Sequence, residues 1–162
     1  MVFDGLVANR TRLFDAYPQS FFAPLGINLK ARVIRLPQRS RVDFLAVLSL
    51  CDIALDTSGF SGGNTSLDAL SVGLPVVTLA GEFMRGRQTF AMLRALPASV
   101  RETLIASDVE SYLDIAQRLL ADAEKRGTLR REISAHAAVH FNDSRPVVAL
   151  REWLLQHVKL SV

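Results

Sequence analysis

Cysteine is almost absent from this chain of 162 residues, in which Cys51 stands alone. A lone cysteine excludes an intrachain disulfide framework and a thiolate metal cluster. No hydrophobic run approaches the about 18 residues that span a bilayer. The chain begins MVFDGLVANR, with acidic Asp4 where a signal peptide has basic residues. We therefore expect a cytoplasmic protein with no membrane contact.

An excess of charge of one sign is also missing. The 19 basic residues stand against 16 acidic ones, for a net charge of +3, so composition gives no support for a nucleic-acid partner. A content of 49% hydrophobic residues, with nine glycines and six prolines, excludes disordered and fibrous classes. A single globular domain over residues 1–162 is expected. Four arginines without interleaved aromatics indicate a solvated or nucleotide-facing patch; they are Arg32, Arg35, Arg39 and Arg41.

The hydrophobic pattern predicts a parallel sheet. Short apolar runs at 31–36, 52–56 and 74–80 are predicted strands, and the last two lack alternation, as is typical of strands buried on both faces. Between them lies a helical stretch, 64–72, closed by Gly73 and Pro75. This order predicts a βαβ unit within a Rossmann-like α/β three-layer sandwich.

Helices dominate the rest of the chain. Ser40 is predicted to cap a helix that reaches Cys51, and helical stretches are expected at 85–96, 125–140 and 146–158, with a short strand at 104–106. Asp108 is expected to cap another helix with one apolar face. The residues of that face are Val109, Tyr112, Leu113, Ala116, Leu119 and Leu120.

A glycine-containing turn from Gly59 to Asp68 leaves the strand at 52–56 and opens the next helix. Glycines let backbone amides approach a ligand, and a helix start offers unpaired N–H groups, which together suit a phosphate. Asn64, Thr65 and Ser66 would add donors, and Asp68 could bind ribose hydroxyls. The spacing matches neither the dinucleotide fingerprint nor the P-loop. Thr65 and Asp68 also fit a capping box that needs no ligand, so both interpretations stay open.

Four blocks of sequence carry a family resemblance: Cys51 to Thr57, Gly62 to Leu70, Gly73 to Glu82 and Arg85 to Arg87. In this order they resemble the C-terminal catalytic half of the O-linked N-acetylglucosamine transferase (SPINDLY) family, above all its bacterial, tetratricopeptide-linked members. The similarity is dense over 31–122 and thinner over the closing helices, 123–162. It implies a metal-independent GT-B glycosyltransferase without a cofactor. Its donor would be a UDP-sugar, with N-acetylglucosamine expected, and its acceptor a protein Ser or Thr.

The resemblance also assigns roles to residues. Gly63, Asn64 and Thr65 occupy the stretch at the donor diphosphate, and Asp68 the ribose position. Several members carry histidine at the position of Gly63, so the glycine would contribute only its amide. Arg87 follows a predicted strand and can reach a sugar or phosphate, although a solvated helix start explains it equally. The expected UDP-sugar-binding residues are Arg39, Ser40, Arg41, Gly62, Gly63, Asn64, Thr65, Ser66, Asp68 and Arg87.

The family's phosphate-binding lysine and candidate base precede the residues seen here, so no catalytic residue is assigned. We expect a fragment cut inside the second domain, inactive alone, whose missing partners are an N-terminal Rossmann domain and tetratricopeptide repeats. The truncated sheet would expose an apolar edge that favours dimerisation. Two alternatives remain: a non-catalytic nucleotide-sugar-binding or regulatory module on the same fold, and an independent small α/β protein.

Three further groups have simpler explanations. His136 and His140 have a spacing that permits zinc binding, but no third ligand is near in sequence, which favours a solvated helix. Asp52 and Asp56 bracket a strand about 13 Å apart, too far to share a proton, so strand-end hydrogen bonding is expected. Cys51 is expected to be a core thiol.

Overall fold

The computed structural model describes residues 2–3, 20–28, 31–141 and 143–158. It divides into two compact units, Met1–Phe44 and Leu45–Val162. The expected single domain, with its core at 31–122 and its helices at 123–162, therefore stays a prediction.

The first unit contains a two-stranded parallel sheet. Strand β1 (Val2–Phe3) pairs with β2 (Arg35–Leu36), with Val2 opposite Arg35. A short 3-10 helix, η1 (Ala23–Leu25), ends at Gly26. The strand predicted over 31–36 is thus confirmed for its last two residues, and it ends before Pro37, which has no N–H for a sheet ladder.

The second unit contains a three-stranded parallel sheet in the order β3-β4-β5. The strands are β3 (Ala54–Leu55), β4 (Val76–Leu79) and β5 (Ile105–Ala106). Each lies within a predicted strand and is shorter than predicted. The predicted burial on both faces holds for most of β4 but not for β3, in which Leu55 is 56% exposed. Helix α3 (Asn64–Ser71) joins β3 to β4, which confirms the βαβ unit.

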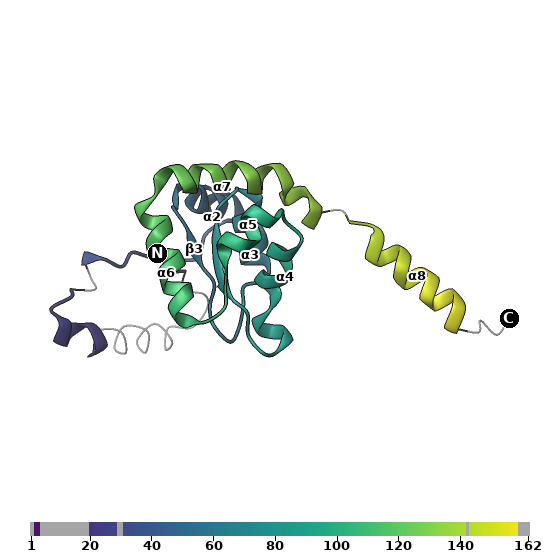
Figure 1. Ribbon diagram of the computed structural model, residues 1–162, viewed down its shortest axis with the longest axis horizontal. Coiled ribbons are helices and arrows are strands. Elements are labelled where there is room, and N and C mark those ends of the chain that lie inside the picture. Colours follow the sequence, from purple (N-terminus) through teal and green to yellow (C-terminus); the bar gives the residue numbers. More distant parts are fainter. Residues whose placement is uncertain (1, 4–19, 29–30, 142, 159–162) are drawn as a thin grey trace. The chain divides into compact units, whose positions relative to one another are not determined.

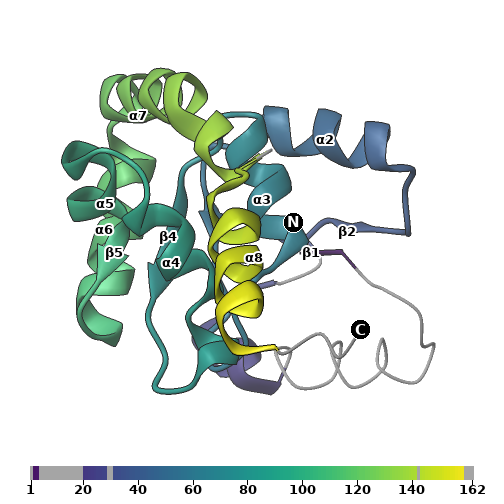
Figure 2. The same cartoon turned by 90° about the vertical axis from the view of Figure 1, so that its right-hand side faces the viewer.

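Helices lie on both sides of this sheet, with α6 on one side and α3, α4 and α5 on the other (Figure 1). Figure 2 shows α7 at the opposite end of the unit from the loop after β4, and α7 contacts α3, α5 and α6. The predicted α/β three-layer arrangement is confirmed. The remaining elements are α2 (Arg41–Leu50), η3 (Met84–Gly86), α4 (Gln88–Arg94), α5 (Ala98–Leu104), α6 (Val109–Ala121), α7 (Ala123–His136), η4 (Ala137–His140) and α8 (Arg145–His157).

The core of the second unit is aliphatic and comes from strands and helices together. Its fully buried members include Leu70, Leu74, Val76, Val77, Leu93, Val100, Leu104, Leu129 and Ile133. Removal of such side chains from water is the main stabilising contribution to the fold. In contrast, α8 buries none of its residues. No described helix has both the length and the apolar character needed to cross a membrane.

Helix α3 ends at Ser71 and is closed by Gly73, as predicted. This residue has φ 73°, and the N–H groups of Gly73 and Leu74 donate to the carbonyls of Leu70 and Ala69 at 3.0 and 2.9 Å. The pair of bonds is a Schellman motif, which satisfies the last carbonyls of a helix. A Cβ on Gly73 would also collide with Ser134 Oγ, so glycine is required here for both conformation and space.

The start of α6 is confirmed, and its predicted apolar face is buried only in part, at Ala116, Leu119 and the half-buried Tyr112. Asp108 accepts a hydrogen bond from the N–H of Ser111 at 2.7 Å, within a capping box. The buried residues of α6 form a narrow stripe of the helix, made of Ile115, Ala116 and Leu119. Apolar residues beside that stripe stay exposed within the described part of the chain. Those exposed residues are Val109, Leu113 and Leu120.

Candidate functional site

The loop that follows β3 is held by one buried carboxylate. Asp56 Oδ1 accepts a hydrogen bond from the N–H of Gly62 at 2.8 Å, and its Oδ2 accepts from Ser61 Oγ at 2.7 Å and Thr78 Oγ1 at 2.6 Å. Asp56 is only 8% exposed, so these donors replace the water that the carboxylate loses on folding. The strand-end hydrogen bonding predicted for Asp56 is confirmed.

Asp52 plays a different part. Its side chain is 62% exposed and lies 3.1 Å from Arg126 Nη2 in a surface ion pair. The two aspartates therefore do not act together, in keeping with the predicted separation.

A cluster of hydroxyl groups supports the same loop from inside. Ser61 Oγ accepts a hydrogen bond from the N–H of Thr89 at 2.9 Å, and Thr89 Oγ1 lies 2.7 Å from Ser66 Oγ. All three residues are buried. The cluster fixes the start of α4 against the first turn of α3. It also turns the Ser66 hydroxyl inward, so this side chain supports the loop rather than facing its surface.

The N-terminus of α3 is open. Gly63 is its N-cap residue and provides no side-chain bond. In the part of the chain that the structure describes, the N–H groups of Gly63, Asn64 and Thr65 meet no acceptor. Asn64 and Thr65 are exposed, and Asp68 is half-buried one turn further on. Unpaired N–H groups and the helix dipole make such a terminus favourable for an anion.

The capping box proposed for Thr65 and Asp68 is wrong. The N-cap is Gly63, two residues before Thr65, so Thr65 lies inside the first turn and cannot be the N-cap. Gly62 has a packing reason to be glycine, because a Cβ there would collide with Ser66 Oγ and lie 2.8 Å from Thr65 Oγ1.

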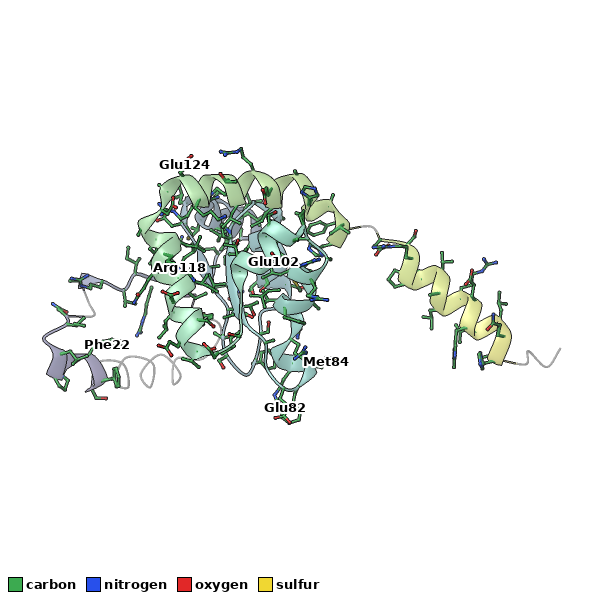
Figure 3. The ribbon with its side chains drawn as sticks, viewed as in Figure 1. Phe22, Glu82, Met84, Glu102, Arg118 and Glu124 are labelled. Carbon is green, nitrogen blue, oxygen red and sulfur yellow. The ribbon has the colours of Figure 1, made fainter. Side chains whose placement is uncertain are left out.

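The loop after β4 meets the loop after β3. The N–H of Ser61 donates to the carbonyl of Arg85 at 2.8 Å. A Cβ on Gly86 would lie 3.2 Å from Gly81 Cα and 3.4 Å from Gly59 O, so Gly81 and Gly86 allow this close approach. In Figure 3, Glu82 and Met84 mark the tip of the second loop.

Arg87 braces this second loop. Its Nη1 donates to the carbonyl of Gly81 at 2.9 Å, and its guanidinium lies 4.7 Å from the centre of the Phe90 ring. The predicted helix at 85–96 is in fact interrupted at Arg87, between η3 and α4. Arg87 therefore lies at the carboxyl edge of the sheet, as expected, with its side chain exposed.

Arg39, Ser40 and Arg41 belong to the first unit. Ser40 Oγ accepts a hydrogen bond from the N–H of Asp43 at 3.2 Å, and its hydroxyl donates to Asp43 Oδ2 at 2.8 Å. These bonds confirm that Ser40 caps α2. The part of these three residues in a donor site stays a prediction.

Tyr112 lies beside the loop after β3, a position that the sequence pattern does not predict. Its hydroxyl donates a hydrogen bond to the backbone carbonyl of Asp56 at 2.8 Å. Burial, with a smaller contribution from the negative charge of Asp56, raises the pKa of Tyr112 to about 12. The sequence contains no local sign of this contact, because α6 and β3 come together only in the folded unit.

The remaining candidates lie away from the loop. Cys51 is half-buried, and its thiol donates to the carbonyl of Val47 at 3.3 Å. His136 is exposed, with Nδ1 2.8 Å from the carbonyl of Glu132. His140 is half-buried, and burial lowers its pKa. Among the residues described, no three metal-binding side chains gather at one place.

A short parallel sheet with an open helix N-terminus at its carboxyl end defines a Rossmann-like α/β unit. Residues 19–144 match glycosyl transferase family 41. The chain belongs to this family.

Individual relatives agree. Over 128 residues the chain is 30% identical to the UDP-N-acetylglucosamine–peptide N-acetylglucosaminyltransferase of Giardia intestinalis. The matched segment covers 78% of this chain and 8% of that protein. It is 29% identical to a probable SPINDLY transferase of Solanum lycopersicum over 56% of this chain and 10% of that protein. A structure of a Thermobaculum terrenum O-GlcNAc transferase mutant superposes with a TM-score of 0.67 at 35% identity, covering 78% of this chain and 24% of the other. The predicted family and fold are confirmed.

Proposed function

We propose that this chain is the donor-binding part of a glycosyltransferase that moves a sugar, N-acetylglucosamine, from UDP to a Ser or Thr of a protein. The observation that carries the proposal is the open N-terminus of α3, at the carboxyl edge of a parallel sheet, in a chain of glycosyl transferase family 41. The named relatives support the choice of donor and acceptor.

In this proposal the diphosphate lies at the first turn of α3. The N–H groups of Gly63, Asn64 and Thr65, with the side chains of the latter two, donate to its oxygens. Departure of the sugar leaves charge on UDP, and fixed N–H donors and the helix dipole stabilise that charge without a metal ion. Asp68 accepts hydrogen bonds from the ribose. Gly62 and Ser66 act from within, through the bonds that shape the loop.

The other expected contacts belong to the same proposal. Arg39, Ser40 and Arg41 would hold the uracil ring and its surroundings. Arg87 is exposed beside the second loop, where its cation favours a phosphate or a sugar hydroxyl.

Most of such an enzyme would come from outside this sequence, since the chain spans 8% of its Giardia relative. We place the base that activates the acceptor in an N-terminal Rossmann domain, and acceptor binding in tetratricopeptide repeats. The isolated chain is then inactive in transfer. We further propose a cytoplasmic protein without nucleic-acid or membrane partners. Among the described residues β3 pairs only with β4, and this free edge would carry dimerisation.

The test is a calorimetric titration of the chain with UDP and with UDP-N-acetylglucosamine. We expect both to bind, and Asp68→Ala to weaken both by about tenfold, because a hydrogen bond to a charged group is lost. Asp114→Ala is the matched control, since Asp114 forms an exposed ion pair with Arg118 on α6.

A folded chain that binds neither nucleotide at millimolar concentration would overturn the proposal. Donor binding without transfer by the longest natural form of the protein would instead favour the non-catalytic binding module.

A further inference from the structure

Gly63 and Gln88 form a pair across two segments of the chain. A Cβ built on Gly63 would lie 2.9 Å from Gln88 Oε1, closer than real Cβ atoms come to any neighbour. The side chain of Gln88 therefore occupies the space that a larger residue at position 63 would fill. Gln88 is the first residue of α4, and Gly63 is the N-cap of α3.

The position of Gln88 follows from its neighbour Thr89. Thr89 is fully buried, its N–H donates to Ser61 Oγ at 2.9 Å, and its hydroxyl lies 2.7 Å from Ser66 Oγ. These bonds fix the backbone of α4 against the first turn of α3. The side chain of Gln88 must then leave α4 beside the open N–H groups of α3.

The carboxamide of Gln88 is available for a ligand. The side chain is half-buried and forms no hydrogen bond within the described residues. Rotation of the carboxamide exchanges its oxygen and nitrogen, so the group can present N–H donors where the oxygen now stands. The N–H groups of Gly63 and Asn64 lie at the same place and meet no acceptor in the described part of the chain.

We propose that Gln88 is a further binding residue of the donor site, whose Nε2 donates a hydrogen bond to the diphosphate held at the first turn of α3. The inference rests on the proposed function and adds a residue to it. Gly63 contributes to the site in two ways. Its backbone N–H faces the diphosphate, and its lack of a side chain leaves room for Gln88. A neutral donor here strengthens binding of the anion and stabilises the departing UDP.

Gln88→Glu is the most informative variant, because it keeps the size of the side chain and replaces an N–H donor by an anionic acceptor. We expect it to weaken UDP binding by more than tenfold through repulsion of the diphosphate. Gln88→Ala removes only the hydrogen bond, so we expect a loss of about threefold to tenfold. Uridine has no phosphate and should bind all forms equally.

Gln117→Glu is the matched control, as the same chemical change on the exposed surface of α6. Gly63→Ala tests the pair itself. Its Cβ meets only the end of a flexible side chain, so the variant folds, but Gln88 must move away. We expect it to weaken UDP binding in the wild-type background and to have less effect in the Gln88→Ala background.

The outcomes separate this inference from the proposed function. Wild-type affinity for UDP in Gln88→Glu and Gln88→Ala, with folded variants, would overturn the role of Gln88 and leave the donor site standing. Equal losses for UDP and uridine would also overturn it, because the effect would then be general to the loop. A wild-type chain that binds no UDP would overturn both proposals.

Discussion

The hydroxyl of Tyr112 on α6 donates a hydrogen bond to the backbone carbonyl of Asp56 at 2.8 Å. The same Asp56 receives three hydrogen bonds on its carboxylate, from Ser61, Gly62 and Thr78. Asp56, which follows β3, thus connects three elements. They are strand β4 through Thr78, the loop after β3 through Ser61 and Gly62, and helix α6 through Tyr112. The shape of the candidate site depends on this junction.

Removal of the Tyr112 hydroxyl should weaken the junction. We expect Tyr112→Phe to lower the free energy of unfolding by about 1 kcal/mol, the usual contribution of one hydrogen bond. Urea denaturation measures the change. An unchanged midpoint would show that the bond to the Asp56 carbonyl contributes nothing to stability.

Tyr112 also gives the protein a dependence on alkaline pH. Its pKa is raised from 10.0 to about 12 in the folded chain, so folding favours the protonated phenol. The stabilisation is present in full below pH 10 and is lost as the pH rises through about 12. Tyr112→Phe should not show this loss. Denaturation of both proteins at a series of alkaline pH values compares the two.

The carboxylate of Asp56 should be far more important than that of Asp52. Asp56→Asn places an NH2 group where only donors point, and we expect a loss of about 2–3 kcal/mol in stability together with weaker UDP binding. Asp52→Asn, which alters an ion pair whose carboxylate is exposed, should cost less than about 1 kcal/mol. Thermal unfolding measures the stability of the two variants, and titration with UDP measures their affinity. Equal effects would contradict the central role of Asp56.

Gly73 and Gly127 should respond oppositely to alanine. Gly73 has φ 73° and no room for a Cβ beside Ser134 Oγ, so Gly73→Ala should cost at least about 1–2 kcal/mol. Adding Ser134→Ala to Gly73→Ala should recover only part of the lost stability, because the backbone strain at residue 73 remains. Gly127 lies within α7, where a Cβ would meet Arg131 at an ordinary 3.6 Å. Gly127→Ala should stabilise by about 0.5–1 kcal/mol; urea denaturation measures all three.

His140 should make the fold sensitive to mild acid. Burial lowers its pKa below 6.5, so folding favours the neutral ring. Stability should fall as the pH drops from about 6.5 through the lowered pKa of the folded state. His140→Leu should lose this part of the acid sensitivity, whereas His136→Gln, at an exposed position, should keep it. Thermal unfolding across this range checks the difference.

Elements with local signals could be predicted from the sequence. The cap at Asp108 depends on Ser111, three residues away, and the end of α3 on the conformation of Gly73. Strand β4 is recognisable because its residues are apolar or buried on both faces, whereas in β3 Leu55 is 56% exposed. Thr65 and Asp68 show the limit of such signals, since a spacing of three also occurs inside a helix whose N-cap lies two residues earlier.

The sequence by itself determined the family, the strand and helix order, and the glycine turn at the carboxyl edge of the sheet. Only the tertiary structure decided that Thr78 and Tyr112 bind Asp56, and that Gln88 fills the space beside Gly63. The physical reason is distance along the chain. Local hydrogen bonds follow from a few neighbouring residues, whereas these contacts exist only after strands and helices have packed into one core.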